Sequence, residues 1–306
     1  MPRPDTRAGR GAPENRTPTR FNLPVREADG DWLDAREDQD GEPTPLRTSV
    51  TIEHPKSIIA YNRSPDIGFD RSINAYRGCE HGCIYCFARP THAFHDLSPG
   101  LDFESRLFAK PDAARLLREE LGKSGYAPRP IAMGTNTDPY QPIEAKWRIT
   151  RSVLEVLAET KHPVTITTKS DRVLRDLDIL APMGRQRLAG VALSVTSLTS
   201  EISRTLEPRA PAARKRLAAV KRLAEAGVPV SVAIAPVVPG VTDHELEAIV
   251  EAAAEAGAQC VFYLPVRLPH EVAPLFRAWL DEHCPDRAGK VMAIIRQMRG
   301  GRGPRP

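Results

Sequence analysis

The feature that most constrains the fold is an alternation, from about residue 65 onward, of short β-branched runs with longer amphipathic segments. The short runs predict strands at Ser72–Tyr76, Pro130–Gly134, Val164–Thr168, Val191–Val195, Val228–Ala233 and Cys260–Leu264. The longer segments predict helices at Pro111–Leu121, Glu144–Thr160, Arg172–Leu180, Pro211–Ala226 and Asp243–Ala256. Such an alternation favours a mostly parallel sheet with right-handed crossovers. Because six units are fewer than the eight of a closed barrel, we expect an α/β fold that forms an open or partial barrel.

Helix-end residues support these boundaries. Gly227 and Gly257 stand where helix C-caps are expected, each directly before a predicted strand. Thr242 is a candidate N-cap, and Glu245 three residues later would complete a capping box.

Residues 1–55 differ from the rest. A basic stretch rich in Pro, Gly and Arg is followed by an acidic one, and neither shows apolar periodicity. We therefore predict a disordered arm over residues 1–55, a core domain over 56–298 and a flexible basic tail over 299–306. No apolar run approaches the roughly 20 residues of a membrane span, and no apolar signal segment is evident. We expect a cytoplasmic protein with no membrane partner.

Three of the five cysteines lie in one segment, NAYRGCEHGCIYCFARP, directly after the first predicted strand. Cys79, Cys83 and Cys86 have the spacing C-x3-C-x2-C, and Gly78 and Gly82 give the segment the freedom to wrap a ligand. In a reducing compartment such cysteines indicate metal binding or catalysis rather than disulfides.

Two metal sites fit this segment. A cubane iron–sulfur cluster normally takes four thiolates, and the next cysteine is Cys260, so one iron would stay open. An open iron suits the amino and carboxylate groups of S-adenosylmethionine, whose reductive cleavage gives a 5′-deoxyadenosyl radical. The alternative is a Cys3His zinc site that recruits His81, His92 or His95.

The string YRGCEHGCIYCFAR, with Tyr85 before the last cysteine, resembles the signature of the radical S-adenosylmethionine (radical SAM) superfamily. More closely it is similar to the spore photoproduct lyase-like and DNA-repair-photolyase-like branch, from about residue 55 to 298. The resemblance implies a partial (β/α)6 barrel of the radical SAM type, a [4Fe–4S] cluster and S-adenosylmethionine. It also implies an external electron donor of the flavodoxin or ferredoxin type, and it makes nucleic acid the leading candidate substrate.

Further motifs follow in the order of that branch. The resemblance implies that the turn in MGTNTDPYQPIE binds the methionine amino group, although an ordinary strand-to-helix turn fits the same residues. The residues of that turn are Gly134, Thr135, Asn136, Thr137 and Asp138, and the resemblance also places Lys169 against the methionine carboxylate. Ser194 and Thr196 share one face of a predicted strand and would bind either a ribose hydroxyl or neighbouring residues of the chain. Arg209 and Glu207 would line the pocket or pair with one another, and Tyr85 completes the candidate cofactor-binding residues.

Two departures limit the resemblance. The lyase uses a hydrogen-donor cysteine some tens of residues after its cluster, whereas no cysteine lies between Cys86 and Cys260 here. Phe87 stands at the position where the resemblance implies a tyrosine-bearing hydrogen-transfer relay in the lyase. A phenylalanine side chain has no O–H group that could donate a hydrogen atom. We therefore do not expect photoproduct repair by the same route. Cys260 is the candidate hydrogen donor, with a small buried hydrophobic residue as the alternative.

Three functional hypotheses result. The first is a radical SAM enzyme, lyase-like or with other hydrogen-abstraction chemistry, acting on an unknown substrate. The second is a non-catalytic zinc or iron–sulfur module that contacts DNA or a protein partner. This hypothesis is supported by the basic residues of one predicted helix, which are Arg214, Lys215, Arg216, Lys221 and Arg222. The third is a methyl- or sulfur-transfer enzyme with a second cluster, for which only two cysteines remain.

Overall fold

The computed structural model describes residues 9–18, 46–65 and 67–298. Its strands are β1 (Ser49–Ile52), β2 (Ile59–Tyr61), β3 (Arg71–Ile73), β4 (Tyr76–Arg77), β5 (Arg106–Ala109), β6 (Ile131–Met133), β7 (Val164–Thr168), β8 (Ala189–Ser194), β9 (Val230–Val237) and β10 (Cys260–Pro265). Its α-helices are α2 (Leu101–Ser105), α3 (Ala113–Leu121), α4 (Glu144–Trp147), α5 (Ile149–Glu159), α6 (Leu177–Arg185), α7 (Ser200–Leu206), α8 (Ala213–Glu225), α9 (Leu246–Glu255), α10 (Val272–His283) and α11 (Ala288–Gln297). Short 3₁₀ helices are η1 (Arg89–His95), η2 (Asp171–Asp176), η3 (Asp243–Glu245) and η4 (Pro285–Arg287).

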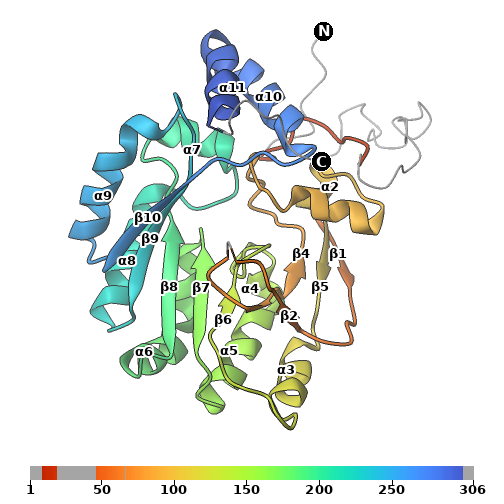
Figure 1. Ribbon diagram of the computed structural model, residues 1–306, viewed down its shortest axis with the longest axis vertical. Coiled ribbons are helices and arrows are strands. Elements are labelled where there is room, and N and C mark those ends of the chain that lie inside the picture. Colours follow the sequence, from red (N-terminus) through yellow and green to blue (C-terminus); the bar gives the residue numbers. More distant parts are fainter. Residues whose placement is uncertain (1–8, 19–45, 66, 299–306) are drawn as a thin grey trace, which may run out of the picture.

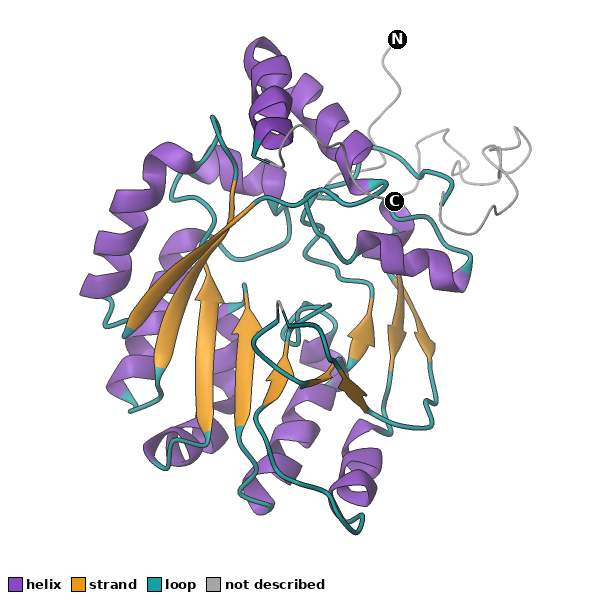
Figure 2. Cartoon of the chain, viewed as in Figure 1, coloured by secondary structure: helices purple, strands orange, loops and turns teal. Residues whose placement is uncertain are grey.

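The large sheet has the strand order β10-β9-β8-β7-β6-β3-β2. Its strands from β3 to β10 pair in parallel, and β2 is antiparallel to β3. Helices line one side of this sheet, and Figure 2 shows its strands fanned side by side in front of them. The six parallel strands confirm the predicted partial (β/α)6 barrel.

A second layer covers the carboxyl ends of the strands. There α10 and α11 pack on Val238 and Val266, which follow β9 and β10, in one apolar cluster with Cys83. The small sheet β1-β5-β4 lies below α2, next to the β2 side of the large sheet (Figure 1). The cysteine loop therefore lies between the strand ends and this covering layer.

The structure corrects several predicted details. The helix expected over 144–160 is two helices, because Arg148 adopts a left-handed conformation with φ 51° between them. The capping box is wrong: the Thr242 hydroxyl accepts from Val238 N at 2.9 Å, and the Glu245 carboxylate accepts from Ser197. The two glycine C-caps are confirmed by left-handed φ values of 80° at Gly227 and 88° at Gly257.

Most of the predicted arm (1–8 and 19–45) and all of the predicted tail (299–306) lie outside the described residues. Two parts of the arm's range do pack against the body. Residues 9–18 contact the region around α2, and Ser49–Ile52 form β1, which pairs with β5. Hydrogen bonds to other segments hold much of both parts, and such bonds leave no apolar periodicity in the sequence. Among the described residues no helix is long and apolar enough to cross a membrane.

Candidate cluster and cofactor site

The cysteine loop follows β4. Cys79 and Cys83 are each 7% exposed, Cys86 is half-buried, and all three are free thiols. Gly78 (φ 71°) and Gly82 (φ 68°) adopt the left-handed conformation that lets the loop turn. Burial raises the pKa of each thiol, and the neighbouring cysteines raise that of Cys79 further. Thiols whose ionisation is opposed by burial suit a site where metal ions supply the positive charge.

Each histidine named for a zinc site makes a contact elsewhere, while His92 Nδ1 and His95 Nε2 are buried without a hydrogen-bond partner among the described residues. His81 Nδ1 lies 3.4 Å from the Asp138 carboxylate, and His92 Nε2 lies 2.9 Å from the Arg106 carbonyl oxygen. His95 stacks on Phe108 with 4.3 Å between ring centroids. Within the described ranges, no three His, Cys, Asp or Glu side chains converge on a single ion. A cubane does not require such convergence, since each thiolate binds its own iron. The donor set fits a cluster better than a Cys3His ion.

The start of the cysteine loop is fastened by the segment after β6. Gln141 Nε2 donates to the Gly78 carbonyl oxygen at 3.1 Å, and Gln141 Oε1 accepts from Glu80 N at 2.9 Å. Its side-chain amide thus brackets Cys79 from both sides. Thr137 Oγ1 adds a bond to the Tyr76 carbonyl oxygen at 3.0 Å. Sequence reasoning missed Gln141, because only residues 134–138 of the motif MGTNTDPYQPIE were considered as site residues.

The turn at 134–138 divides into two parts. Thr137 is buried, and the Asp138 carboxylate accepts from the Thr168 hydroxyl and from Lys169 N, both at 2.7 Å. Burial alone would raise the pKa of Asp138, but His81 and these donors lower it to about 2. Thr137 and Asp138 are therefore committed to the chain's own groups. Gly134, Thr135 and Asn136 are half-buried and keep backbone carbonyls near the site.

A second buried network centres on the Glu207 carboxylate, which is 1% exposed. Thr196 Oγ1 donates to it at 2.6 Å, and Tyr85 and Arg216 donate to its two oxygens. Lys169 Nζ lies 3.7 Å from it. Burial opposes ionisation, yet Arg216 and Lys169 outweigh it and lower the pKa of Glu207 to about 2. The network joins three predicted cofactor-site residues, Tyr85, Lys169 and Thr196, to a buried negative charge.

Arg216 corrects one sequence interpretation. It was grouped with the exposed basic residues of its helix, but it is 2% exposed and donates to the Ser194 carbonyl oxygen at 2.8 Å. It therefore positions Glu207 and the end of β8. Arg214 and Lys215, its neighbours, are exposed as expected.

Lys169 and Arg209 both approach the cysteine loop. Lys169 Nζ lies 5.7 Å from the centroid of the Tyr85 ring and donates to the Ala235 carbonyl oxygen at 3.3 Å. Arg209 Nη2 lies 3.2 Å from Glu80 Oε1, so it pairs with Glu80 of the loop rather than with Glu207. Lys169 and Arg209 thus each contact a different residue of the cysteine loop, Tyr85 and Glu80 respectively.

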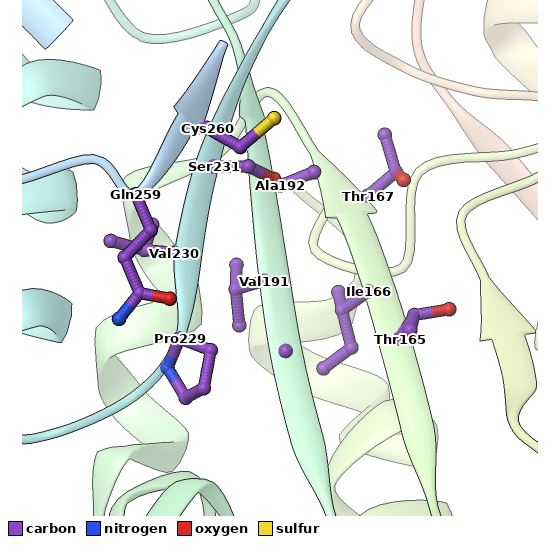
Figure 3. A pocket seen from close by; sticks show the side chains of 11 residues that line it. Thr165, Ile166, Thr167, Val191, Ala192, Pro229, Val230, Ser231, Gln259 and Cys260 are labelled. Atoms are coloured by element: carbon purple, nitrogen blue, oxygen red, sulfur yellow. The ribbon is translucent and has the colours of Figure 1, made fainter. Parts of the chain in front are cut away.

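Cys260 is exposed, so the alternative of a buried hydrophobic residue is wrong. It starts β10 and belongs to a cross-sheet row in which Cys260 pairs with Ser231, Ser231 with Ala192, and Ala192 with Thr167. These side chains line an open pocket of about 220 Å³ on the inner face of the sheet (Figure 3). Ser194 stands two residues beyond Ala192 and so projects from the same face.

The comparisons with known proteins agree with this geometry. A family model described as "Radical SAM superfamily" matches residues 73–253. Uncharacterized proteins of Mycobacterium tuberculosis and Mycobacterium bovis are each 34% identical to this chain over 258 residues, which is 83% of this chain and 76% of the relative. An uncharacterized protein of Methanocaldococcus jannaschii is 30% identical over 200 residues, 65% of this chain and 73% of that protein.

Solved structures of spore photoproduct lyase share the fold. A mutant with bound AdoMet and dinucleoside spore photoproduct superposes with a TM-score of 0.55 at 15% identity, over 77% of this chain and 66% of the lyase. The lyase complexed with the dinucleoside photoproduct gives a TM-score of 0.52 at 16% identity. The chain spans just under two thirds of the length of these lyase chains.

Proposed function

The chain belongs to the radical SAM superfamily of enzymes, whose members use S-adenosylmethionine and an iron–sulfur cluster, and on this premise we propose that Cys79, Cys83 and Cys86 hold a [4Fe–4S] cluster. The observation that carries the proposal is the set of three free thiols, two buried and one half-buried, in one loop at the carboxyl ends of the parallel strands. The next cysteine, Cys260, stands on β10, an edge strand of the large sheet. Membership of this superfamily of enzymes argues against the hypothesis of a non-catalytic metal-binding module.

When bound, the cluster supplies one electron that breaks the sulfonium bond to C5′, leaving methionine and a 5′-deoxyadenosyl radical. The chain's own residues bind and orient the cofactor. The Lys169 ammonium group would face the methionine carboxylate, and the Glu207 carboxylate lies 3.7 Å from Lys169 Nζ. Backbone carbonyls of Gly134, Thr135 and Asn136 would accept from the amino group. Ser194, on the inner face, would meet the ribose.

In this proposal Tyr85, Thr196 and Arg209 do not bind the cofactor directly but position the residues around it. The Tyr85 and Thr196 hydroxyls are bound to Glu207, and Arg209 is bound to Glu80. Their bonds keep Lys169 and the cysteine loop in place around the cofactor. Thr137 and Asp138, which the resemblance assigned to the amino group, serve instead to shape the turn that presents residues 134–136.

We propose nucleic acid as the substrate class and an external flavodoxin- or ferredoxin-type protein as the electron donor. The fold shared with a lyase whose structure holds a dinucleoside photoproduct supports the substrate class. Cys260 would return a hydrogen atom to the substrate radical, since it faces the pocket on the sheet's inner side. Phe87, which is 59% exposed and has no hydroxyl group, leaves the photoproduct itself a poor candidate.

The test is anaerobic reconstitution with iron and sulfide, followed by dithionite and S-adenosylmethionine. We expect 5′-deoxyadenosine and methionine in equal amounts. Cys83→Ala should abolish both products, whereas Cys284→Ala, outside the loop, should retain them. Cluster-loaded protein that forms neither product would refute the proposal. Deuterium transfer into 5′-deoxyadenosine from labelled oligonucleotide pools would then identify the substrate class.

A further inference from the structure

Residues 9–18, which we call the strap, lie against the cysteine loop although some 70 residues separate them in sequence. The strap appears in red beside α2 in Figure 1. Ala12 is 1% exposed and belongs to the same apolar cluster as Cys83, Ile84 and Tyr85. At its far end, Asn15 Nδ2 donates to Asp102 Oδ1 at 3.2 Å, and Arg16 N donates to Ser98 Oγ at 2.7 Å.

The strap and the loop touch backbone to backbone. A Cβ atom added to Gly11 would stand 1.7 Å from the Gly82 carbonyl oxygen, and one added to Gly82 would stand 3.3 Å from Gly11 N. Gly82 is the residue directly before Cys83 and lies between two of the three thiols. A side chain at Gly11 would therefore have to push the strap away from the loop.

One buried ion pair joins the two segments. The Glu104 carboxylate, 0% exposed, accepts from Gly11 N and Ala12 N, each at 2.8 Å, and from Arg89 Nη2 at 2.5 Å. Arg89, also 0% exposed, donates to the carbonyl oxygens of Gly82 at 3.0 Å and Cys83 at 2.9 Å. Because a buried charge without a partner is costly, each half of this arrangement holds the other in place.

Arg10 adds a third attachment. Its guanidinium donates to the Glu104 carbonyl oxygen at 2.7 Å and to the Leu46 carbonyl oxygen at 2.8 Å. These two bonds connect the strap both to α2 and to the segment that leads into β1. The strap is thus bound along its length by charged hydrogen bonds, which are the stronger kind.

From these contacts, and resting on the proposed cluster, we propose that the strap is a cover over the Gly82 side of the cluster site. Docked on Glu104, it keeps water and dioxygen from the cluster, and Glu104 and Arg89 are positioning residues for strap and loop together. In air, dioxygen is the oxidant and the cluster's iron and sulfide are oxidised. Release of the strap should therefore shorten the life of the cluster without removing any of its ligands.

The test compares Gly11→Ala with Gly289→Ala in the full chain. Position 289 has nothing within 4 Å of an added Cβ, so it is a matched control. The first readout uses the apo protein: hydrogen exchange of residues 9–18 and tryptic cleavage after Arg10 should each be about tenfold or more faster in Gly11→Ala alone. The second readout is the loss of cluster absorbance in air, which should be about threefold or more faster in the same variant.

Arg10→Met gives an independent route to the same release, since it removes all three guanidinium hydrogen bonds, including the one to Thr48 Oγ1 at 3.1 Å, without adding a side chain at Gly11. Unchanged hydrogen exchange of residues 9–18 in both variants would refute the docking of the strap on the cysteine loop. Faster exchange of the strap with an unchanged cluster lifetime in air would refute its role as a cover. Failure of the proposed function looks different, because then the wild-type chain itself would load no cluster or would cleave no S-adenosylmethionine.

Discussion

Replacing Gln141 by methionine should loosen the start of the cysteine loop. The Gln141 side chain is 0% exposed, and its two hydrogen bonds satisfy the Gly78 carbonyl and the Glu80 N–H. Methionine fills a similar volume but leaves both backbone groups buried without partners. Each such group costs about 1–3 kcal/mol, so the free energy of unfolding should fall by about 2–6 kcal/mol.

Equilibrium urea unfolding of the apo protein measures this change, with the slope held common to both proteins. Gln297→Met, on an exposed position of α11, makes the same chemical change without a buried partner and should shift stability by less than about 0.5 kcal/mol. Reconstituted Gln141→Met should also retain less iron than the wild type. A loss of stability no larger than that of the control would refute the conclusion that the two Gln141 hydrogen bonds hold the backbone on either side of Cys79.

Three further outcomes are expected. Gly134→Ala should cost at least about 2 kcal/mol in the same unfolding assay, because φ is 82° and an added Cβ would stand 1.9 Å from the Thr167 carbonyl oxygen; a neutral change would contradict this. Burial lowers the pKa of His92 from 6.5 to about 4. As the pH falls, the unfolded chain therefore takes up the proton before the folded chain does. About 3 kcal/mol of folding stability that is present above pH about 6.5 is lost as the pH falls towards 4. His92→Phe should flatten that pH dependence of apo-protein stability, and an unchanged profile would count against it. Lys169→Met should raise the KM for S-adenosylmethionine by about tenfold with cluster content unchanged, and an unaltered KM would exclude the carboxylate contact.

The architecture was predictable because it rests on periodicity. The strand Val164–Thr168 was predicted to the residue, since its buried and exposed positions alternate regularly. The helix over 144–160 was not predicted in two parts, because nothing in the residue type of Arg148 signals its left-handed conformation. The strap was missed for a related reason: its contacts are backbone N–H groups on a distant carboxylate, and these leave no apolar pattern.

The site was predictable only where spacing carries chemistry. The three cysteines are close in sequence, so their pattern alone indicates a metal ligand set. Gln141, Glu104 and Arg89 act through atoms contributed by other segments, and no local pattern distinguishes them from ordinary polar residues. Asp138 shows the opposite case: it lies in the right motif, but tertiary contacts to Thr168 and Lys169 occupy its carboxylate.

The most direct test of the account is the metal content of anaerobically reconstituted protein, measured with the electron paramagnetic resonance spectrum of its reduced form. We predict about four iron and four sulfide per chain, lost in Cys79→Ala, Cys83→Ala and Cys86→Ala, and a spectrum that changes when S-adenosylmethionine is added. One zinc per chain with no iron–sulfur signal, or a full cluster whose spectrum ignores S-adenosylmethionine, would contradict the central claim.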